Sequence, residues 1–412
     1  MFVEFIECTK CGEKYKSGLN YNCTKCGSIL DIKYDYEKIR DRIDMRRLPI
    51  SGSGVWRYKE LLPIENPSNI VSLNEGSTPL YKAERLGEAF GLRNLYVKDE
   101  TRNPTGSFKD RPITVAVSKA RELGVGTVAS SSSGNAGGSL AAYAAKAGLK
   151  CIIFAPSSTL DSKLIPIALY GSRIVIVDGT VSDAFYLAKK ASEEHGWFNA
   201  TSTFVNPYQL EGDKTVAYEM VEQTGGEVPD WVFIPIGAGP LLVGCWKGFK
   251  ELNLLGCTTK LAHMVGIQAE GCAPIVKAFR ENTDKVDSWG KLTTIVYAIA
   301  DPLVGYSQDG TYTLRNIRES GGVAEACSDK EILDSVKLLA NKEGIFAEPA
   351  GAAAVAGAKK LLDEGKVGSD ENVVCVVTGT GLKQMVSEHF ERPKPIRPDS
   401  KELERFLEKT GL

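Results

Sequence analysis

The chain has 412 residues, of which 43% are hydrophobic and 25% charged, and its formal net charge is −2. This composition is that of a globular protein with room for about two domains and a small appendage. It excludes the strong field of one sign that nucleic acid or an anionic membrane would require. The apolar runs are too short to span a bilayer, and the N-terminus reaches acidic residues and cysteines too early for a signal peptide. We therefore expect a cytoplasmic protein with no nucleic-acid or membrane partner.

Two Cys-Thr-Lys-Cys-Gly turns open the chain. They contain Cys8, Cys11, Cys23 and Cys26. Each turn can point two thiolates at one metal ion, so the four cysteines predict a closed, structural site in a zinc-ribbon-like segment. Zinc is the expected ion, although iron suits four thiolates as well. The alternative is a degenerate ribbon with four free thiols.

The remaining pattern is that of alternating strands and helices, which predicts parallel sheets. Residues 54–58 and 61–64, in an extended linker, are expected to form a docking strand that packs on the main body. Strands are then predicted over 95–98, 127–130, 150–155, 173–178, 231–235, 264–270 and 372–377. Helices are predicted over 110–123, 137–147, 161–170, 182–195, 212–223, 241–252, 273–281, 330–343 and 351–364. A charged tail ends the chain and becomes helical.

The predicted fold class is α/β, with two doubly wound domains facing each other across a cleft, in addition to the ribbon. Ligands of such sheets lie beyond the carboxyl ends of the strands. The expected division is 1–34 for the ribbon, 35–97 for an extension with part of the large domain, 98–206 for a small domain, 207–390 for the large domain and 391–412 for the tail.

Lys109 lies in the first of four loops that follow predicted strands. It stands at a Gly-Ser turn that enters a helix. The positive end of the helix dipole lowers the pKa of such a lysine, which makes it a candidate Schiff-base nucleophile. A lone lysine at this position is more often an exposed side chain.

The second loop, residues 130–136, offers hydroxyls, backbone N–H groups and the amide of Asn135 to an anion such as a carboxylate. A serine-rich helix cap is the alternative there. In the fourth loop, the hydroxyl of Thr378 ends a buried strand and can bond the nitrogen of a heterocycle, unless it serves only the turn.

The third loop joins a strand to a helix and contains Gly237, Ala238, Gly239, Pro240 and Leu241. Its glycines allow a phosphate to approach the helix N-terminus. A dinucleotide site would need another glycine where the chain has Leu242. A lysine, an anion loop, a phosphate cup and a hydroxyl are together what pyridoxal 5′-phosphate (PLP) requires of a protein.

With these loops the chain resembles the threonine synthases, which are fold-type II PLP enzymes related to the β subunit of tryptophan synthase. The resemblance reaches to about residue 390. The segments that carry it, besides the ribbon, are GVWRY (54–58), EGSTPL (75–80), NPTGSFKDR (103–111), NPYQLEGDKT (206–215), EGIFAEPA (343–350) and TGTGLK (378–383).

The resemblance implies a role for each loop. Lys109 would carry PLP as a Schiff base with Phe108 near the ring, Asn135 would bond the phenolic oxygen, and Thr378 would face the pyridine nitrogen. The loop of residues 237–241 would hold the phosphate. The expected binding site for a small amino-acid substrate contains Ser132, Ser133, Gly134 and Ala136, of which the first three would receive its carboxylate. The expected assembly is a homodimer.

Three places depart from the pattern that threonine synthases use for the phosphate of their substrate. Ala136 stands where they have threonine, Thr203 and Phe204 replace Asn-Ser, and Gln209 replaces an arginine that could bind phosphate with two hydrogen bonds. The phosphate cup is also closer to that of the ammonia-lyases.

The predicted function is a threonine synthase-like lyase that converts O-phospho-L-homoserine and water to L-threonine and phosphate. The alternative that the departures favour is elimination or replacement at Cβ of a serine-like or threonine-like amino acid. A third hypothesis, a non-catalytic PLP-binding or metal-binding protein, is disfavoured by the intact set of Lys109, Asn135 and Thr378.

Overall fold

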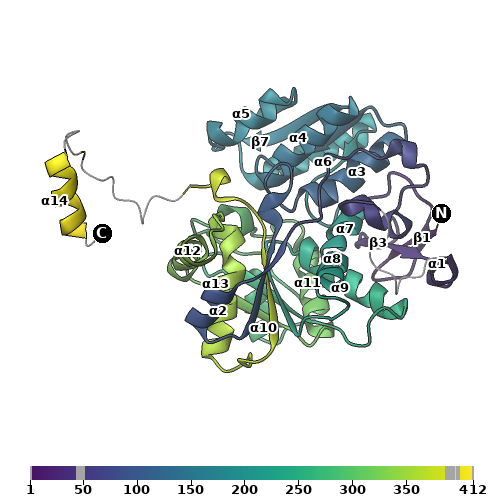
Figure 1. Ribbon diagram of the computed structural model, residues 1–412. Coiled ribbons are helices and arrows are strands. Elements are labelled where there is room, and N and C mark those ends of the chain that lie inside the picture. The colour runs from purple at the N-terminus through teal and green to yellow at the C-terminus, as the bar shows by residue number, and fades with distance from the viewer. Residues whose placement is uncertain (1, 43–51, 386–394, 396–399, 411–412) are drawn as a thin grey trace.

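The computed structural model describes residues 2–42, 52–385, 395 and 400–410. Their strands form three sheets (Figure 1). The N-terminal sheet is antiparallel, in the order β2-β1-β3, and is followed by a short helix. Its elements are β1 (Val3–Cys8), β2 (Lys14–Tyr15), β3 (Leu30–Tyr34) and α1 (Tyr36–Arg42).

Buried polar contacts fasten this N-terminal sheet to the main body. The ammonium group of Lys247 lies 2.7 Å from the Asp31 carboxylate of β3 and 2.6 Å from that of Glu211. The hydroxyl of Tyr34 donates to Glu211 at 2.7 Å. Because each buried charge faces a partner, the ribbon packs as a fixed part of the fold.

The larger sheet has the order β12-β11-β10-β13-β5-β4, and its strands are parallel except for β4. Its strands are β4 (Leu80–Lys82), β5 (Asn94–Asp99), β10 (Trp231–Pro235), β11 (His263–Ala269), β12 (Val323–Cys327) and β13 (Asn372–Val377). One apolar cluster joins it to α2, α12 and α13, and another joins it to α8, α9 and α11. The helices of this part are α2 (Glu84–Phe90), α8 (Thr215–Gln223), α9 (Pro240–Leu254), α10 (Pro274–Arg280), α11 (Ser307–Glu319), α12 (Asp329–Leu338) and α13 (Pro349–Asp363).

The smaller sheet is parallel, in the order β8-β7-β6-β9. Its strands are β6 (Thr127–Ser130), β7 (Lys150–Pro156), β8 (Arg173–Val177) and β9 (Phe198–Asn199). The helices that accompany it are α3 (Asp110–Glu122), α4 (Asn135–Ala147), α5 (Asp161–Leu169) and α6 (Val181–His195). The chain then returns through α7 (Pro207–Asp213), and α14 (Ser400–Thr410) lies near its end.

The predicted α/β fold is confirmed, and each of the seven strands predicted from residue 95 onward is present to within one residue at either end. Strands of buried β-branched residues, joined by turns that contain glycine, are strong sequence signals for an α/β fold. The boundary expected between residues 97 and 98 falls inside β5, where Val97 and Lys98 both pair with β13. Those residues therefore belong to the larger sheet, and the rest of the domain division stays a prediction.

The docking strand expected at 54–58 is wrong, because Val55–Leu61 forms a 3-10 helix, and only from Leu62 (φ −120°, ψ 151°) is the backbone extended. The expected packing on the main body is present, since Val55 and Leu62 contact Val115 of α3. Gly54 turns the chain with φ +61°, and the Val55 N–H donates to the Glu75 carbonyl at 3.0 Å. The turn places the Trp56 side chain against Thr114 and the Tyr58 side chain against Glu222. In a straight strand these two side chains, two residues apart, would both point to one face.

Helix α11 and strand β12 had no prediction, and the helix expected over 212–223 is two helices. The sequence of α11, SQDGTYTLRNIRE, is mostly polar, while Glu325 interrupts the short apolar run of β12. Neither gives a clear periodic signal. Among the described residues, no helix has the length and apolar character needed to cross a membrane.

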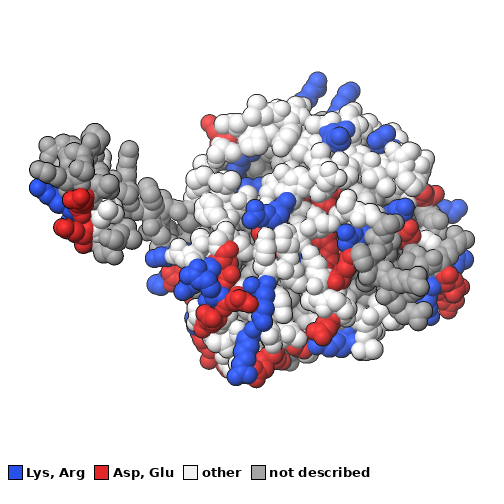
Figure 2. All heavy atoms as spheres, viewed as in Figure 1, with Lys and Arg blue, Asp and Glu red and all other residues white. Residues whose placement is uncertain are grey.

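Basic and acidic side chains are intermixed on the face shown in Figure 2, and the region over the smaller sheet is mostly uncharged. A network of charged groups also lies inside the protein. The Arg111 guanidinium is fully buried, with its nitrogens 2.7 Å from carboxylate oxygens of Glu100 and Glu219. Lys98 reaches the same Glu219 oxygen at 2.7 Å. This network joins the end of β5, the first turn of α3 and α8.

We predict that Arg111→Met lowers the free energy of unfolding by about 3–5 kcal/mol, because it leaves two buried carboxylates without their main partner. The midpoint and slope of urea unfolding measure the loss. The matched control is Arg93→Met, which removes an exposed ion pair with Asp370 and is expected to leave the midpoint unchanged. Equal midpoints for the two variants would contradict the role of the network.

Candidate active site

Lys109 lies between the two sheets, in the loop that leads from β5 to α3. The loop pairs with the segment after β13: Ser107 and Gly379 form an antiparallel bridge, and the Phe108 N–H donates to the Thr378 carbonyl at 3.0 Å. Gly106 permits the close approach, since a Cβ there would lie 2.7 Å from the Thr380 methyl. The structure thereby brings Lys109, Phe108 and Thr378 together.

The Lys109 side chain has few polar partners. Its ammonium group donates to the Ser202 hydroxyl and lies 4.4 Å from the centre of the Phe108 ring. Burial lowers the pKa of Lys109, while Asp213 and Asp301 act in the opposite direction. A lysine with a lowered pKa has more of the neutral, nucleophilic amine at working pH.

Asn135, the first residue of α4, faces the same segment from the side of the smaller sheet. Its amide donates to the Glu348 carboxyl at 2.7 Å. A Cβ at Gly379 would lie 2.4 Å from that carboxyl and 3.3 Å from the Asn135 amide nitrogen, so the three groups are neighbours. Burial raises the pKa of Glu348 and favours its protonated form.

The serine loop lies between β6 and α4. The Ser133 hydroxyl is 3.3 Å from that of Thr159, and the Gly134 N–H donates to the Ser132 hydroxyl at 3.3 Å. Ala136 is 3% exposed, whereas Gly134 is exposed. The loop connects to the lysine through the neighbouring segment, because the Ser131 N–H donates to Thr201, one residue before Ser202.

The loop of residues 237–241 carries β10 into the 15-residue helix α9. Gly239 has φ +98°, and a Cβ on it would lie 2.4 Å from the Thr313 side chain, whose hydroxyl donates to the Ala238 carbonyl at 2.5 Å. Within the described residues, the N–H groups of Gly237, Ala238 and Gly239 donate to no backbone carbonyl. Free N–H groups at a helix N-terminus form an anion site, so this loop fits a phosphate group.

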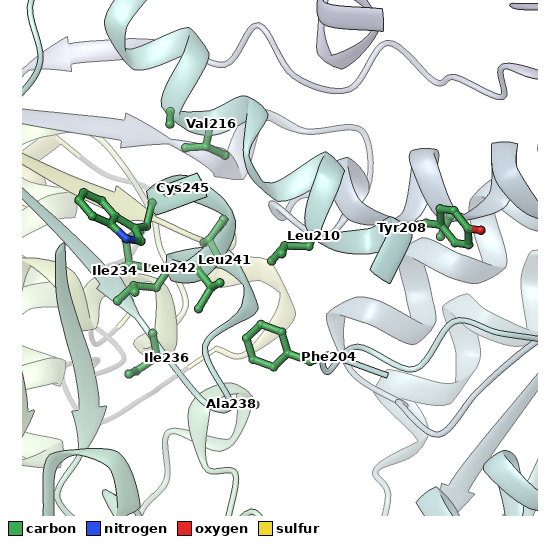
Figure 3. Close-up of a cluster of buried hydrophobic side chains, with 14 of the residues drawn as sticks. Phe204, Tyr208, Leu210, Val216, Ile234, Ile236, Ala238, Leu241, Leu242 and Cys245 are labelled. Carbon is green, nitrogen blue, oxygen red and sulfur yellow. The ribbon is translucent and has the colours of Figure 1, made fainter. Parts of the chain in front are cut away.

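Apolar side chains pack against the loop of residues 237–241. Figure 3 shows the Phe204 ring between Ala238 and Leu210, beside the leucines of α9. Phe204 also contacts Tyr312 edge to face, with ring centres 5.3 Å apart. Two of the positions that depart from the threonine synthase pattern, Thr203 and Phe204, are therefore buried, at 6% and 4% exposure.

The third departure, Gln209, is 3% exposed, and its amide nitrogen has no hydrogen-bond partner in the described chain. One helical turn later, Asp213 is 1% exposed, and its Oδ1 also lacks a partner. Residues four apart share a face of a helix. Burial raises the pKa of Asp213 to about 7, although Lys109 and Arg111 lower it.

The four cysteines of the ribbon converge, with sulfur atoms all within 4.8 Å of one another. The Cys8–Cys26 and Cys11–Cys23 sulfurs are each 3.5 Å apart. Four thiols so close fit a single tetrahedral ion.

A scan of protein families matches residues 71–379 to the description "Pyridoxal-phosphate dependent enzyme". The curated threonine synthase of Methanocaldococcus jannaschii is 44% identical over 97% of this chain and 98% of its own length. That of Methanosarcina acetivorans is 42% identical over 95% of both. The chain belongs to the threonine synthase family of PLP-dependent enzymes. The expected family and the threonine synthase-like enzyme function are thereby confirmed.

Solved structures share the fold of this threonine synthase family member at lower identity. Diaminopropionate ammonia lyase from Escherichia coli has a TM-score of 0.63 and 18% identity over 92% of this chain and 95% of that one. A threonine deaminase from Solanum lycopersicum has a TM-score of 0.63 and 23% identity over 81% and 83%. These likenesses support the fold alone.

Sequence reasoning missed Ser202, Asp213, Asp301, Thr313 and Glu348. Each of these residues contacts a predicted site residue, or shifts its pKa, only because the fold brings the two together. No motif at its own position indicates such a role. Asp213 and Glu348 do lie within segments that resemble the family, NPYQLEGDKT and EGIFAEPA, and this was the one available signal.

We predict that Gly239→Ala weakens PLP binding by about tenfold or more, because a side chain at φ +98° costs about 1–2 kcal/mol and also collides with Thr313. Fluorescence titration of cofactor-free protein with PLP measures the affinity. The matched control is Gly226→Ala, at φ +100° with open space around it, and it should leave PLP affinity unchanged.

Proposed function

We propose that the protein converts O-phospho-L-homoserine and water to L-threonine and phosphate, with PLP held at Lys109. The observations that carry the proposal are the pairing of the Lys109 loop with the segment after β13 and the glycine loop of residues 237–241, whose first three N–H groups donate to no backbone carbonyl among the described residues. When bound, PLP withdraws electrons from the substrate α-carbon. The two curated relatives at 44% and 42% identity support the substrate.

The roles proposed for the residues follow from their positions. Lys109 holds the cofactor and moves the proton at the α-carbon, and the Ser202 hydroxyl orients its amine. The loop of residues 237–241 binds the cofactor phosphate through its N–H groups. Asn135 and Thr378 bind the ring oxygen and the ring nitrogen. The substrate carboxylate binds at Ser132, Ser133 and Gly134, beside Ala136, and Phe108 packs near the ring.

A second candidate function is elimination at Cβ of a hydroxylated amino acid. It is favoured by the charges near Lys109, since the groups that act on it, Asp213 and Asp301, are carboxyls. In its ionised form each of these carboxyls repels a phosphate-bearing side chain, and the uncharged Gln209 offers no compensating cation. Both candidates use the same residues for PLP.

The deciding experiment incubates holoenzyme with O-phospho-L-homoserine, L-threonine, L-serine and O-phospho-L-serine, and assays phosphate, threonine and 2-oxo acid separately. Phosphate together with threonine supports the first candidate. A 2-oxo acid from serine or threonine supports the second. The absence of turnover with all four would contradict both.

We predict that Lys109→Ala lowers kcat/KM by at least about 10²–10⁴-fold, because the residue that moves the proton is gone. Mass spectrometry after borohydride reduction should find PLP on a peptide with Lys109 in the wild type and no such adduct in the variant. Lys146→Ala, an exposed lysine on α4, is the control and should keep both activity and adduct. An adduct on another lysine in the wild type would refute the assignment.

We also propose that Cys8, Cys11, Cys23 and Cys26 hold one structural zinc ion. Elemental analysis of protein with reduced thiols should find about one zinc per chain. Cys11→Ser should lose the metal and lower the melting temperature, whereas Cys257→Ser, outside the cluster, should keep it. Wild-type protein without bound metal would contradict the site. The homodimer and the cytoplasmic location stay predictions.

A further inference from the structure

Buried carboxyls around Lys109 have partners, with one exception. Glu100 and Glu219 pair with Arg111, Glu211 and Glu251 pair with Lys214, and Asp110 accepts from Thr105 and Ser139. Asp213 is as deeply buried, yet within the described residues its carboxyl forms no ion pair and its Oδ1 accepts no hydrogen bond. An unpaired buried charge is costly, so Asp213 needs either a proton or a nearby cation.

Glycines hold Asp213 in its place. A Cβ at Gly212 would lie 2.0 Å from the Arg111 carbonyl oxygen, so α7 touches the first turn of α3, next to Lys109. A Cβ at Gly244 of α9 would lie 2.6 Å from the Asp213 Cβ. Asp213 is thus wedged between α3 and α9 and cannot withdraw to solvent.

Lys109 is the nearby cation without an ion-pair partner of its own among the described residues, and it can therefore balance the charge of Asp213. Two carboxyls raise the pKa of Lys109 against the effect of burial, and Asp213 contributes more than Asp301. Asp301 already accepts hydrogen bonds from the Tyr306 hydroxyl at 2.8 Å and the Leu303 N–H at 3.0 Å. The other charged groups that act on Asp213 are Arg111 and Glu100, which neutralise each other in the buried network. Cys245 of α9 also faces Asp213.

We propose that Asp213 is the buried counter-charge of Lys109 and shares one proton with it. The pair holds one proton, either on the Lys109 nitrogen or on the Asp213 carboxyl, and has zero net charge in both states. Asp213 is then a positioning residue that acts through Lys109. It lets the amine become neutral to attack the cofactor and keeps the linking nitrogen protonated afterwards. This rests on the proposed attachment of PLP to Lys109.

The test is a pH titration of the holoenzyme absorbance, which reports whether the nitrogen that links Lys109 to PLP carries a proton. A neighbouring carboxylate stabilises the protonated form and raises its pKa. Asp213→Asn is therefore expected to move the midpoint down by about one pH unit or more, and Asp301→Asn by less. Asp230→Asn, whose carboxylate pairs with Lys260 at the surface, is the control and should leave it unmoved. A midpoint in Asp213→Asn equal to that of the wild type would overturn the proposal.

A second measurement covers the case in which Asp213→Asn does not fold. In wild-type protein labelled with carbon-13 at aspartate carboxyls, two buried carboxyls should titrate near neutral pH, since burial raises the pKa of both Asp213 and Asp309 to about 7. The Asp213 midpoint should change when PLP is removed. No aspartate that responds to the cofactor would also overturn the proposal. Mass spectrometry separates the two claims. Without PLP on Lys109 the proposed function fails, whereas with PLP attached and an unmoved midpoint only the role of Asp213 fails.

Discussion

The bridge between Ser107 and Gly379 is the contact on which the rest of the site depends. It ties the lysine-bearing loop to the segment after β13, so the position of Lys109 is set by backbone hydrogen bonds rather than by its own flexible side chain. The Arg111 network also fixes the same loop, since Arg111 stands two residues after Lys109 and is fully buried. From this anchor α3 leads into the smaller sheet, and the lysine remains between the two sheets.

Features with a local cause were predictable from the sequence. Glycine turns between apolar strands and helices placed the four loops, and paired CxxC turns placed the thiols. Thr203 and Phe204 illustrate the limit. Their identities signalled a departure, but only the fold places Phe204 between Ala238 and Leu210 (Figure 3). The 3-10 helix at Val55–Leu61 was missed because two hydrogen bonds from Trp56 and Tyr58 to distant helices decide it.

Buried carboxyl groups of this protein lie in two kinds of environment. The networks of Arg111 and of Lys247 compensate each carboxylate and hold elements together. Around the predicted PLP position the carboxyls of Asp213 and Glu348 instead have pKa values raised by burial. The pKa of Asp213 is raised to about 7, so this carboxyl can gain or lose a proton at neutral pH. The first kind supports structure, and the second is available for chemistry.

The register of β5 on β13 also constrains how the protein is made. Asn94 pairs with Asn372, so 278 residues must be synthesised between one strand and its neighbour. At about 5–20 residues per second, this takes about 15–60 s on the ribosome. During that time the smaller sheet, whose strands all lie between residues 127 and 199, can be completed, while β5 waits with one edge unpaired. Newly made chains thus pass through a stage with an exposed strand edge, at which chaperones and aggregation compete for them.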